Sequence, residues 1–449
     1  MSTIKKLSWI ALSVALMTTV LMVTACGGNE EETSTGPSGT PVGTPDTTGI
    51  TDTSITFGTH FPLSGNPAAA FAPISYGMKA YFDYINAQGG VYGRKINLII
   101  GDDQFNPANT VEVVRKLVEQ DKVFGILSGL GAETHKAVYQ YLEENGVPDL
   151  AISDGLKMWT NPVAHNRFTA TVTYDSEGQV LGKYIFDHYP NAKVGILETN
   201  DSSGTEGEEG VRKGIEGSNV EIVAVEKYDV TQSDVSSQTQ RLKASDADVL
   251  IGLAQPNQAA SMVKTARGTL NWDIPMFVSG INCSEIFPAL ASPQYAEGVI
   301  STAFGPMVYD TENPGVQKYQ KIWEKFQYGY SGPLNNFALY GMALAETTVY
   351  QLEMTGKDLS RQSFLDVAEN MCKFLCSSCD RGYAPSTSPT DHRGSETIYV
   401  NQVQKDGTWK RIGDPVSFES TTECTPQTPP EGFDQQPKVG LDAPYVETP

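Results

Sequence analysis

Residues 54–101, SITFGTHFPLSGNPAAAFAPISYGMKAYFDYINAQGGVYGRKINLIIG, decide the fold of this chain. They begin with an alternating apolar pattern over 54–60 and end with an apolar run over 95–101, and both patterns predict strands. Between the strands, apolar side chains recur at helical spacing before Gly89-Gly90 ends the helix; they are Ile74, Met78, Tyr81, Phe82 and Ile85. Strand, helix and strand at this spacing predict a right-handed βαβ unit with parallel pairing.

The same alternation continues along the chain in two series. In the first, Asn106-Pro107 is a good helix start, and strands are expected over 123–128 and 149–153. The second series contains short strands rich in Val and Ile, at 193–198, 220–225, 248–254 and 275–279, and is followed by long helices at 314–326 and 336–354 and a hairpin over 397–412. Two such series predict an α/β fold of two Rossmann-like lobes with parallel sheets, because about 370 residues exceed what one core usually serves.

The N-terminus has the three parts of a secretory signal. Lys5 and Lys6 precede an apolar run over residues 7–23, and small residues stand before Cys26. The run Val23-Thr24-Ala25-Cys26 resembles the lipobox of bacterial lipoproteins, which implies a signal peptide over 1–25, lipidation of Cys26 and an extracytoplasmic, lipid-anchored protein. A plain transmembrane anchor is the alternative, although the run is near the lower limit of roughly 17 residues for a span and lacks a following stop-transfer charge.

Composition separates a folded centre from two polar tails. Residues 26–52 are almost entirely Gly, Thr, Ser, Pro and acidic residues, and residues 421–449 are rich in Pro, Gln and Glu, so we expect a disordered linker and a disordered tail. The formal net charge of -21 argues against nucleic-acid binding and against adsorption to an anionic membrane surface. It says little about the ligand, because a cleft can differ locally from the whole molecule.

Five short motifs, taken in their order and spacing, carry a resemblance to a known family. They are Pro62-Leu63-Ser64-Gly65, residues 85–93 (INAQGGVYG), Asp102-Asp103, residues 200–204 (NDSSG) and residues 243–248 (KASDAD). Residues 53–415 thereby resemble the periplasmic binding proteins of the branched-chain amino acid type. The resemblance implies the type I fold, in which two lobes joined by three crossing strands close on a small-molecule ligand. It implies a monomer that serves an ABC permease and ATPase, with lobe 1 over 53–172 plus 305–368 and lobe 2 over 173–304 plus 369–420.

The ligand site is expected beyond the carboxyl ends of the strands, where ligands of open α/β sheets bind. Helix N-termini and turn N–H groups point there and favour a carboxylate. The candidate ligand-binding residues in these loops are Ser64, Phe71, Ala132, Glu133, Ser153, Gly155, Trp159, Asp201, Ser203, Gln255 and Ser279. Turn and cap chemistry is the alternative role for each polar residue, and core packing is the alternative for each aromatic one.

Position by position, the resemblance departs from the amino-acid binders of the family. Their two carboxylate-binding hydroxyls fall on Ala132 and Gly155, and their ammonium-binding acid falls on Gly280. Backbone donors remain available for a carboxylate, and Glu133 or Asp201 for an ammonium. We therefore expect the ligand to be an amino acid or a related small carboxylate, amide or aromatic acid.

Four cysteines gather near the C-terminus, as Cys372-x-x-x-Cys376-x-x-Cys379 and Cys424. The spacing of the first three resembles the iron–sulfur signature of radical S-adenosylmethionine enzymes. An oxidising compartment favours disulfides instead, and we expect two bridges among the four, in one of three pairings, with Cys283 free. A structural zinc site is a further alternative.

The sequence carries no catalytic motif of the common kinds. It has no Gly-x-Ser-x-Gly elbow, no His-Glu-x-x-His and no phosphate loop. Its five histidines are scattered, and His135 is interpreted as a solvated histidine at a helix start. We therefore expect a binding protein without a cofactor or a metal, and not an enzyme. The alternatives are a lipoprotein that reports ligand occupancy to a membrane signalling partner, and an extracytoplasmic enzyme on a doubly wound fold.

Overall fold

The computed structural model describes residues 44–433, apart from 66, 328, 331, 375, 379–385 and 419–423. The expected signal peptide, Cys26 and the linker up to residue 43 lie outside the described residues, as do Cys379 and the tail beyond residue 433. Within the described residues, no helix is both long enough and apolar enough to cross a membrane.

The first sheet is parallel throughout and contains the βαβ unit that the sequence predicts. Its strands are β1 (Ser54–Phe61), β2 (Lys95–Asp102), β3 (Ile126–Leu127), β4 (Asp149–Ile152) and β5 (Arg167–Thr169), in the order β2-β1-β3-β4-β5. The connections are α1 (Ala68–Asn86), α2 (Pro107–Glu119), α3 (Ala132–Lys136), α4 (Tyr139–Glu144) and the 3-10 helix η1 (Lys157–Trp159). The Asn106 side chain caps α2 by accepting a hydrogen bond from Ala108 N–H at 2.9 Å, so the predicted helix start is confirmed.

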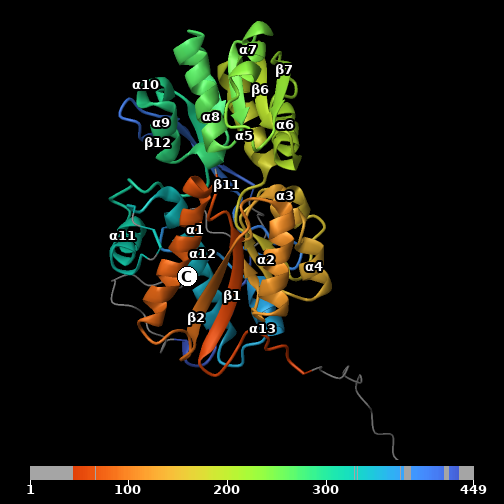
Figure 1. Ribbon diagram of the computed structural model, residues 1–449, viewed down its shortest axis with the longest axis vertical. Coiled ribbons are helices and arrows are strands. Elements are labelled where there is room, and N and C mark those ends of the chain that lie inside the picture. The colour runs from red at the N-terminus through yellow and green to blue at the C-terminus, as the bar shows by residue number, and fades with distance from the viewer. Residues whose placement is uncertain are drawn as a thin grey trace, which may run out of the picture. The chain divides into compact units, whose positions relative to one another are not determined.

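The second sheet is parallel in its centre and antiparallel at one edge. In spatial order its strands are β12 (Trp409–Arg411), β11 (Thr397–Val403), β10 (Ile300–Ala303), β9 (Met276–Val278), β8 (Val249–Leu253), β6 (Lys193–Thr199) and β7 (Glu221–Tyr228), with β13 (Val416–Ser417) paired to β11. Its helices are α5 (Tyr174–His188), α6 (Ser202–Gly214), α7 (Ser236–Ala244), α8 (Pro256–Val263), η2 (Lys264–Thr269), η3 (Gly280–Asn282), α9 (Ile286–Ala291) and α10 (Pro293–Ala296). Figure 1 shows that the hairpin of β11 and β12, which joins the edge of this sheet, belongs to the blue, C-terminal part of the chain. The predicted second series and the final hairpin are therefore confirmed.

Three helices from the second half of the chain return to the first sheet. α11 (Pro314–Phe326), α12 (Asn336–Thr355) and α13 (Arg361–Ala368) share one apolar core with β1 and α1, and α12 packs along α1 (Figure 1). The rings of Phe124 and Phe364 meet edge to face in this core, with centroids 5.3 Å apart. The chain therefore crosses three times from the elements of one sheet to those of the other. An α/β fold with two Rossmann-like lobes is confirmed.

Buried charged side chains fix the returning helices. Glu346 of α12 accepts a hydrogen bond from Lys318 Nζ of α11 at 2.6 Å. Burial opposes ionisation of Glu346, but Lys318 and neighbouring hydroxyls hold its pKa below the ordinary value. Arg361 of α13 donates to the carbonyl of Phe124 at 2.8 Å and pairs with Asp46 at 3.0 Å. The described end of the expected linker is therefore attached to the folded body.

Candidate functional site

A cavity of about 310 Å³ lies between elements of the two sheets. The side of the first sheet contributes Phe71 of α1 and Ser153 after β4, and the side of the second sheet contributes Glu177 of α5, Gly280 of η3 and Phe304 after β10. Most of the other lining side chains are apolar, and the described lining residues include no Lys, Arg or His. The cavity therefore suits a ligand with a large apolar part and few polar groups.

One face of α12 follows this cavity for four turns. Its lining residues recur at helical spacing: Asn336, Phe337, Leu339, Tyr340, Ala343, Leu344, Thr347, Thr348 and Gln351. Fifteen residues separate the first from the last, which corresponds to about 22 Å of helix at 1.5 Å per residue. At the far end the Thr348 hydroxyl donates to its own helix at 2.9 Å and the Thr387 hydroxyl donates to the Ala368 carbonyl at 2.6 Å. The cavity is therefore elongated and mostly apolar where it runs beside α12.

Polar groups gather where the cavity reaches the loop after β4. The Ser153 hydroxyl hydrogen-bonds the Ser128 hydroxyl at 2.6 Å and the Tyr340 hydroxyl at 3.0 Å. Asp154 accepts hydrogen bonds from the Tyr174 hydroxyl at 2.8 Å and from Trp159 Nε1 at 2.7 Å. Burial raises the pKa of Asp154, while these bonds oppose the shift. Trp159 therefore supports the loop after β4 through its hydrogen bond to Asp154.

Glu177 is a buried carboxyl group in the wall of the cavity. It lies in the first turn of α5, and its Oε1 accepts a hydrogen bond from Gly280 N–H at 2.5 Å. Burial raises the pKa of Glu177 to about 7, against the opposing effect of Gly280 N–H and the Thr302 hydroxyl. A Cβ atom at position 280 would lie 2.8 Å from Thr302 Oγ1 and 3.4 Å from Glu177 Oε2. A side chain at position 280 would therefore crowd the Thr302 hydroxyl, whereas its contact with the Glu177 carboxyl would be an ordinary one.

A second, more open hollow lies where α3 and η1 face α6, and it contains two predicted residues. Glu133 Oε1 accepts from the Ser202 hydroxyl at 2.8 Å, and Lys157 N–H donates to Glu206 at 2.9 Å. Both contacts join an element of the first sheet to α6 of the second. Asp201 lines the same hollow and caps α6 by accepting from Gly204 N–H at 3.1 Å.

The structure brings some of the predicted ligand-binding residues together and separates others. Phe71, Ser153, Gly155 and Ser279 line the elongated cavity, whereas Glu133 and Asp201 line the open hollow. The remaining five line neither: Ser64 bonds Asp102, Ala132 and Trp159 share a small apolar cluster, Ser203 bonds Asp201, and Gln255 N–H donates to the Tyr228 hydroxyl. Sequence reasoning missed the lining face of α12 and Glu177. The near-continuous apolar pattern of α12 was the available signal, because a helix buried on all sides must contact several parts of the fold.

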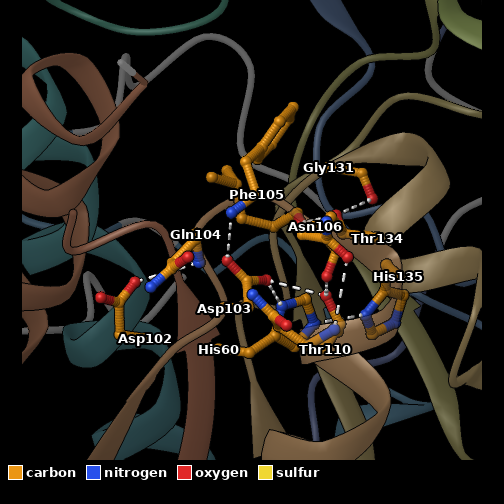
Figure 2. A network of polar contacts seen from close by, with 12 residues as sticks. His60, Asp102, Asp103, Gln104, Phe105, Asn106, Thr110, Gly131, Thr134 and His135 are labelled. Atoms are coloured by element: carbon orange, nitrogen blue, oxygen red, sulfur yellow. Dashed lines mark hydrogen bonds and ion pairs between the residues drawn. The ribbon is translucent and has the colours of Figure 1, made fainter. Parts of the chain in front are cut away.

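Four buried side chains form a chain of hydrogen bonds near the loop after β3, and Figure 2 shows three of them, Asp103, His60 and His135. His60 Nδ1 lies 2.8 Å from Asp103 Oδ2, His60 Nε2 lies 3.0 Å from His135 Nδ1, and His135 Nε2 lies 2.9 Å from Asp149 Oδ2. The two imidazole rings lie nearly parallel, with centroids 5.3 Å apart and an interplanar angle of 14°. Both rings are fully buried, so the interpretation of His135 as a solvated histidine is wrong. Burial lowers the pKa of His60, against the opposing effect of Asp103.

The cysteines are used as disulfides where the structure describes them. Cys372 and Cys424 form one bridge, and Cys376 is also disulfide-bonded. Cys283 is free and buried, and burial raises the pKa of its thiol to about 12, so it is unreactive. The expected disulfide use and the free Cys283 are confirmed. No group of three potential metal ligands occurs among the described residues.

Comparisons with known proteins agree on one family. A family model described as "Periplasmic binding protein" matches residues 54–408. The Leu/Ile/Val-binding protein homolog 1 of Brucella suis is 26% identical over 254 residues, which are 56% of this chain and 67% of that protein. A branched chain amino acid ABC transporter structure from Thermus thermophilus with bound valine has a TM-score of 0.72 at 19% identity, covering 82% of this chain and 97% of that one. A fatty acid ABC transporter substrate-binding protein from Thermomonospora curvata has a TM-score of 0.71 at 22% identity, covering 84% and 96%.

Proposed function

This chain belongs to the periplasmic binding protein family, whose members bind solutes outside the cytoplasm, and we propose that it is the lipid-anchored receptor of an ABC importer. Its structural neighbours are solute-binding proteins, and the protein is not an enzyme. In this proposal Cys26 carries the lipid, residues 26–43 form a tether, and a monomer delivers its ligand to a permease and an ATPase. In this proposal lobe 1 comprises residues 53–172 plus 305–368, and lobe 2 comprises residues 173–304 plus 369–420.

One observation carries the proposal: an apolar cavity with walls from the elements of both sheets. We propose that its ligand is an amino acid or a related small carboxylate, amide or aromatic acid with a large apolar part. The names of the similar proteins support ligands of this kind, since they mention Leu, Ile and Val, bound valine, and fatty acid. Phe71, Ser153, Gly155 and Ser279 are the predicted residues whose positions support ligand contact.

The proposed mechanism is closure of the lobes around the ligand. A ligand that touches both lobes binds the closed form better than the open form, and that difference in affinity sets the population of the closed form. Contacts across the open hollow, such as Ser202 with Glu133 and Lys157 with Glu206, support closure because they join an element of the first lobe to α6 of the second. Neither contact involves the elongated cavity.

Thermal unfolding of the full chain against a panel of amino acids, aromatic acids, amides and fatty acids tests the proposal. A ligand that binds the native state alone stabilises it by about 2.7 kcal/mol at a hundredfold excess over its Kd. Small-angle scattering should then show compaction with the same ligand. A panel without any stabilising member, or a stabilising ligand that leaves the scattering profile unchanged, would contradict the proposal.

A further inference from the structure

We propose that Glu177 is the specificity-determining residue of the cavity, and that its carboxylate accepts hydrogen bonds from a primary ammonium group on an otherwise apolar ligand. The inference rests on the proposed function, because it assigns part of the ligand chemistry in the same cavity. Within the ligand class proposed above it favours amino acids over carboxylates, amides and aromatic acids that lack an amine, and it adds apolar amines to that class.

The first argument is that Glu177 is buried and has no charged partner among the residues that the structure describes. Only 7% of the residue is exposed, and the groups that act on it are the uncharged Gly280 N–H and Thr302 hydroxyl. A buried carboxylate is costly unless it is paired with a cation or accepts several hydrogen bonds. A carboxylate offers about four acceptor sites, of which these two donors occupy at most two. The remaining sites suit an ammonium group, which carries three donors.

The second argument is the charge of the surrounding wall. The described residues that line the cavity include no Lys, Arg or His, so no side chain of the wall neutralises either Glu177 or an anionic ligand. A ligand whose single polar group is a carboxylate would face the like charge of Glu177, whereas an ammonium would complete a buried ion pair. The wall therefore discriminates between the two head groups by the sign of the charge.

The third argument is the position of the carboxyl group in the fold. Gly280 lies on η3, after β9, and its N–H donates to Glu177 Oε1 of α5 at 2.5 Å across 103 positions of the chain. Both residues line the cavity, so this bond holds the Glu177 carboxyl group against the η3 wall. The carboxyl group therefore stands at a fixed place in the cavity wall.

Other titratable groups near Glu177 do not share its role. The Cys283 thiol faces it, but burial raises the pKa of that thiol to about 12. Tyr174 and Tyr340 line the same cavity, and burial raises the pKa of both phenols. Asp154 already accepts hydrogen bonds from Tyr174 and Trp159. Between pH 5.5 and pH 8, binding of an amine should therefore follow the ionisation of Glu177.

The test compares ligands that differ by one group, using calorimetry on the full chain in detergent. L-Leucine is matched with 4-methylpentanoate, which lacks the amine, and with 3-methylbutylamine, which lacks the carboxylate. At pH 8 the amine-bearing ligands should bind at least tenfold more tightly than 4-methylpentanoate. Glu177→Gln should weaken the amine-bearing ligands by about 30-fold or more, because it removes one partner of a buried charge pair, and should leave 4-methylpentanoate unchanged or tighter. Glu206→Gln, at the open hollow, should change the binding of all three ligands alike.

The pH dependence provides a test that needs no variant. Lowering the pH from 8 to 5.5 should weaken binding of leucine and strengthen binding of 4-methylpentanoate, because protonated Glu177 no longer pairs with an ammonium or repels a carboxylate. If the amine-free acid binds as tightly as leucine at both pH values, the assignment of Glu177 is wrong and the proposed function stands. If no amino acid, acid, amide or amine of the panel binds, the proposed function itself is wrong.

Discussion

Replacing His60 with leucine should destabilise the fold strongly, because this ring connects two halves of a buried hydrogen-bond chain. The change removes the 2.8 Å bond to Asp103 and the 3.0 Å bond to His135. Asp103 keeps donors from Phe105 N–H at 2.9 Å and from the Thr110 hydroxyl at 3.1 Å, whereas His135 Nδ1 loses its partner. Each orphaned buried polar group costs about 1–3 kcal/mol, and breaking a buried charged network costs about 3–5 kcal/mol in total.

The sign of the pH effect follows from the lowered pKa of His60. In the unfolded chain this histidine takes up a proton near pH 6.5, but the buried ring resists a second proton. Unfolding in acid therefore binds a proton, so the free energy of unfolding falls as the pH drops below about 6.5, by at most about 1.4 kcal/mol per pH unit. The wild-type protein should show this slope between pH 6.5 and pH 5, and His60→Leu should show a shallower one, because His392, whose pKa burial also lowers, still contributes in this way.

Urea unfolding at several pH values measures both effects, with the m-value as a check on the transition. His188→Gln is the control, because His188 is exposed on α5 and its replacement should change the free energy of unfolding by about 0.5 kcal/mol or less. A loss below 1 kcal/mol in His60→Leu, or the same acid slope in the variant as in the wild type, would refute the reasoning.

Three other substitutions give further predictions. Cys424→Ser should lower the free energy of unfolding by about 4 kcal/mol, since the bridge to Cys372 closes a loop with a separation of 52 residues, and urea unfolding of the variant beside the wild type, both without reductant, measures this loss. Glu346→Gln removes the buried ion pair between Glu346 and Lys318 and should cost about 3–5 kcal/mol in urea unfolding. Ala343→Phe fills part of the elongated cavity beside α12 and should weaken the binding of large apolar ligands at least tenfold in calorimetry, without weakening the binding of small ligands. Ala108→Phe, on the exposed start of α2, should change the binding of neither kind of ligand.

Features that depend on neighbouring residues were predictable from the sequence. The βαβ unit of 54–101 follows from apolar spacing and from the glycines that end the helix, and the start of α2 follows from Asn106-Pro107. Pairs that are distant in the chain were not predictable. His60 and His135 are 75 residues apart, and Glu177 and Gly280 are 103 residues apart. No periodicity records which loops meet after folding, so the sequence predicts a solvated role for His135 and gives no reason to select Glu177.

The chemistry of Glu177 bears on the mechanism of closure as well as on specificity. Closing the lobes without a ligand removes water from this carboxyl group and supplies no cation, so the empty closed form is disfavoured or must hold a protonated Glu177. A ligand ammonium removes that penalty only when the carboxyl group is enclosed with it. The ligand therefore gains its extra affinity in the closed form, which is the condition for shifting the population of the two forms. An apolar body alone would contact the wall beside α12 in either form and would shift that population less.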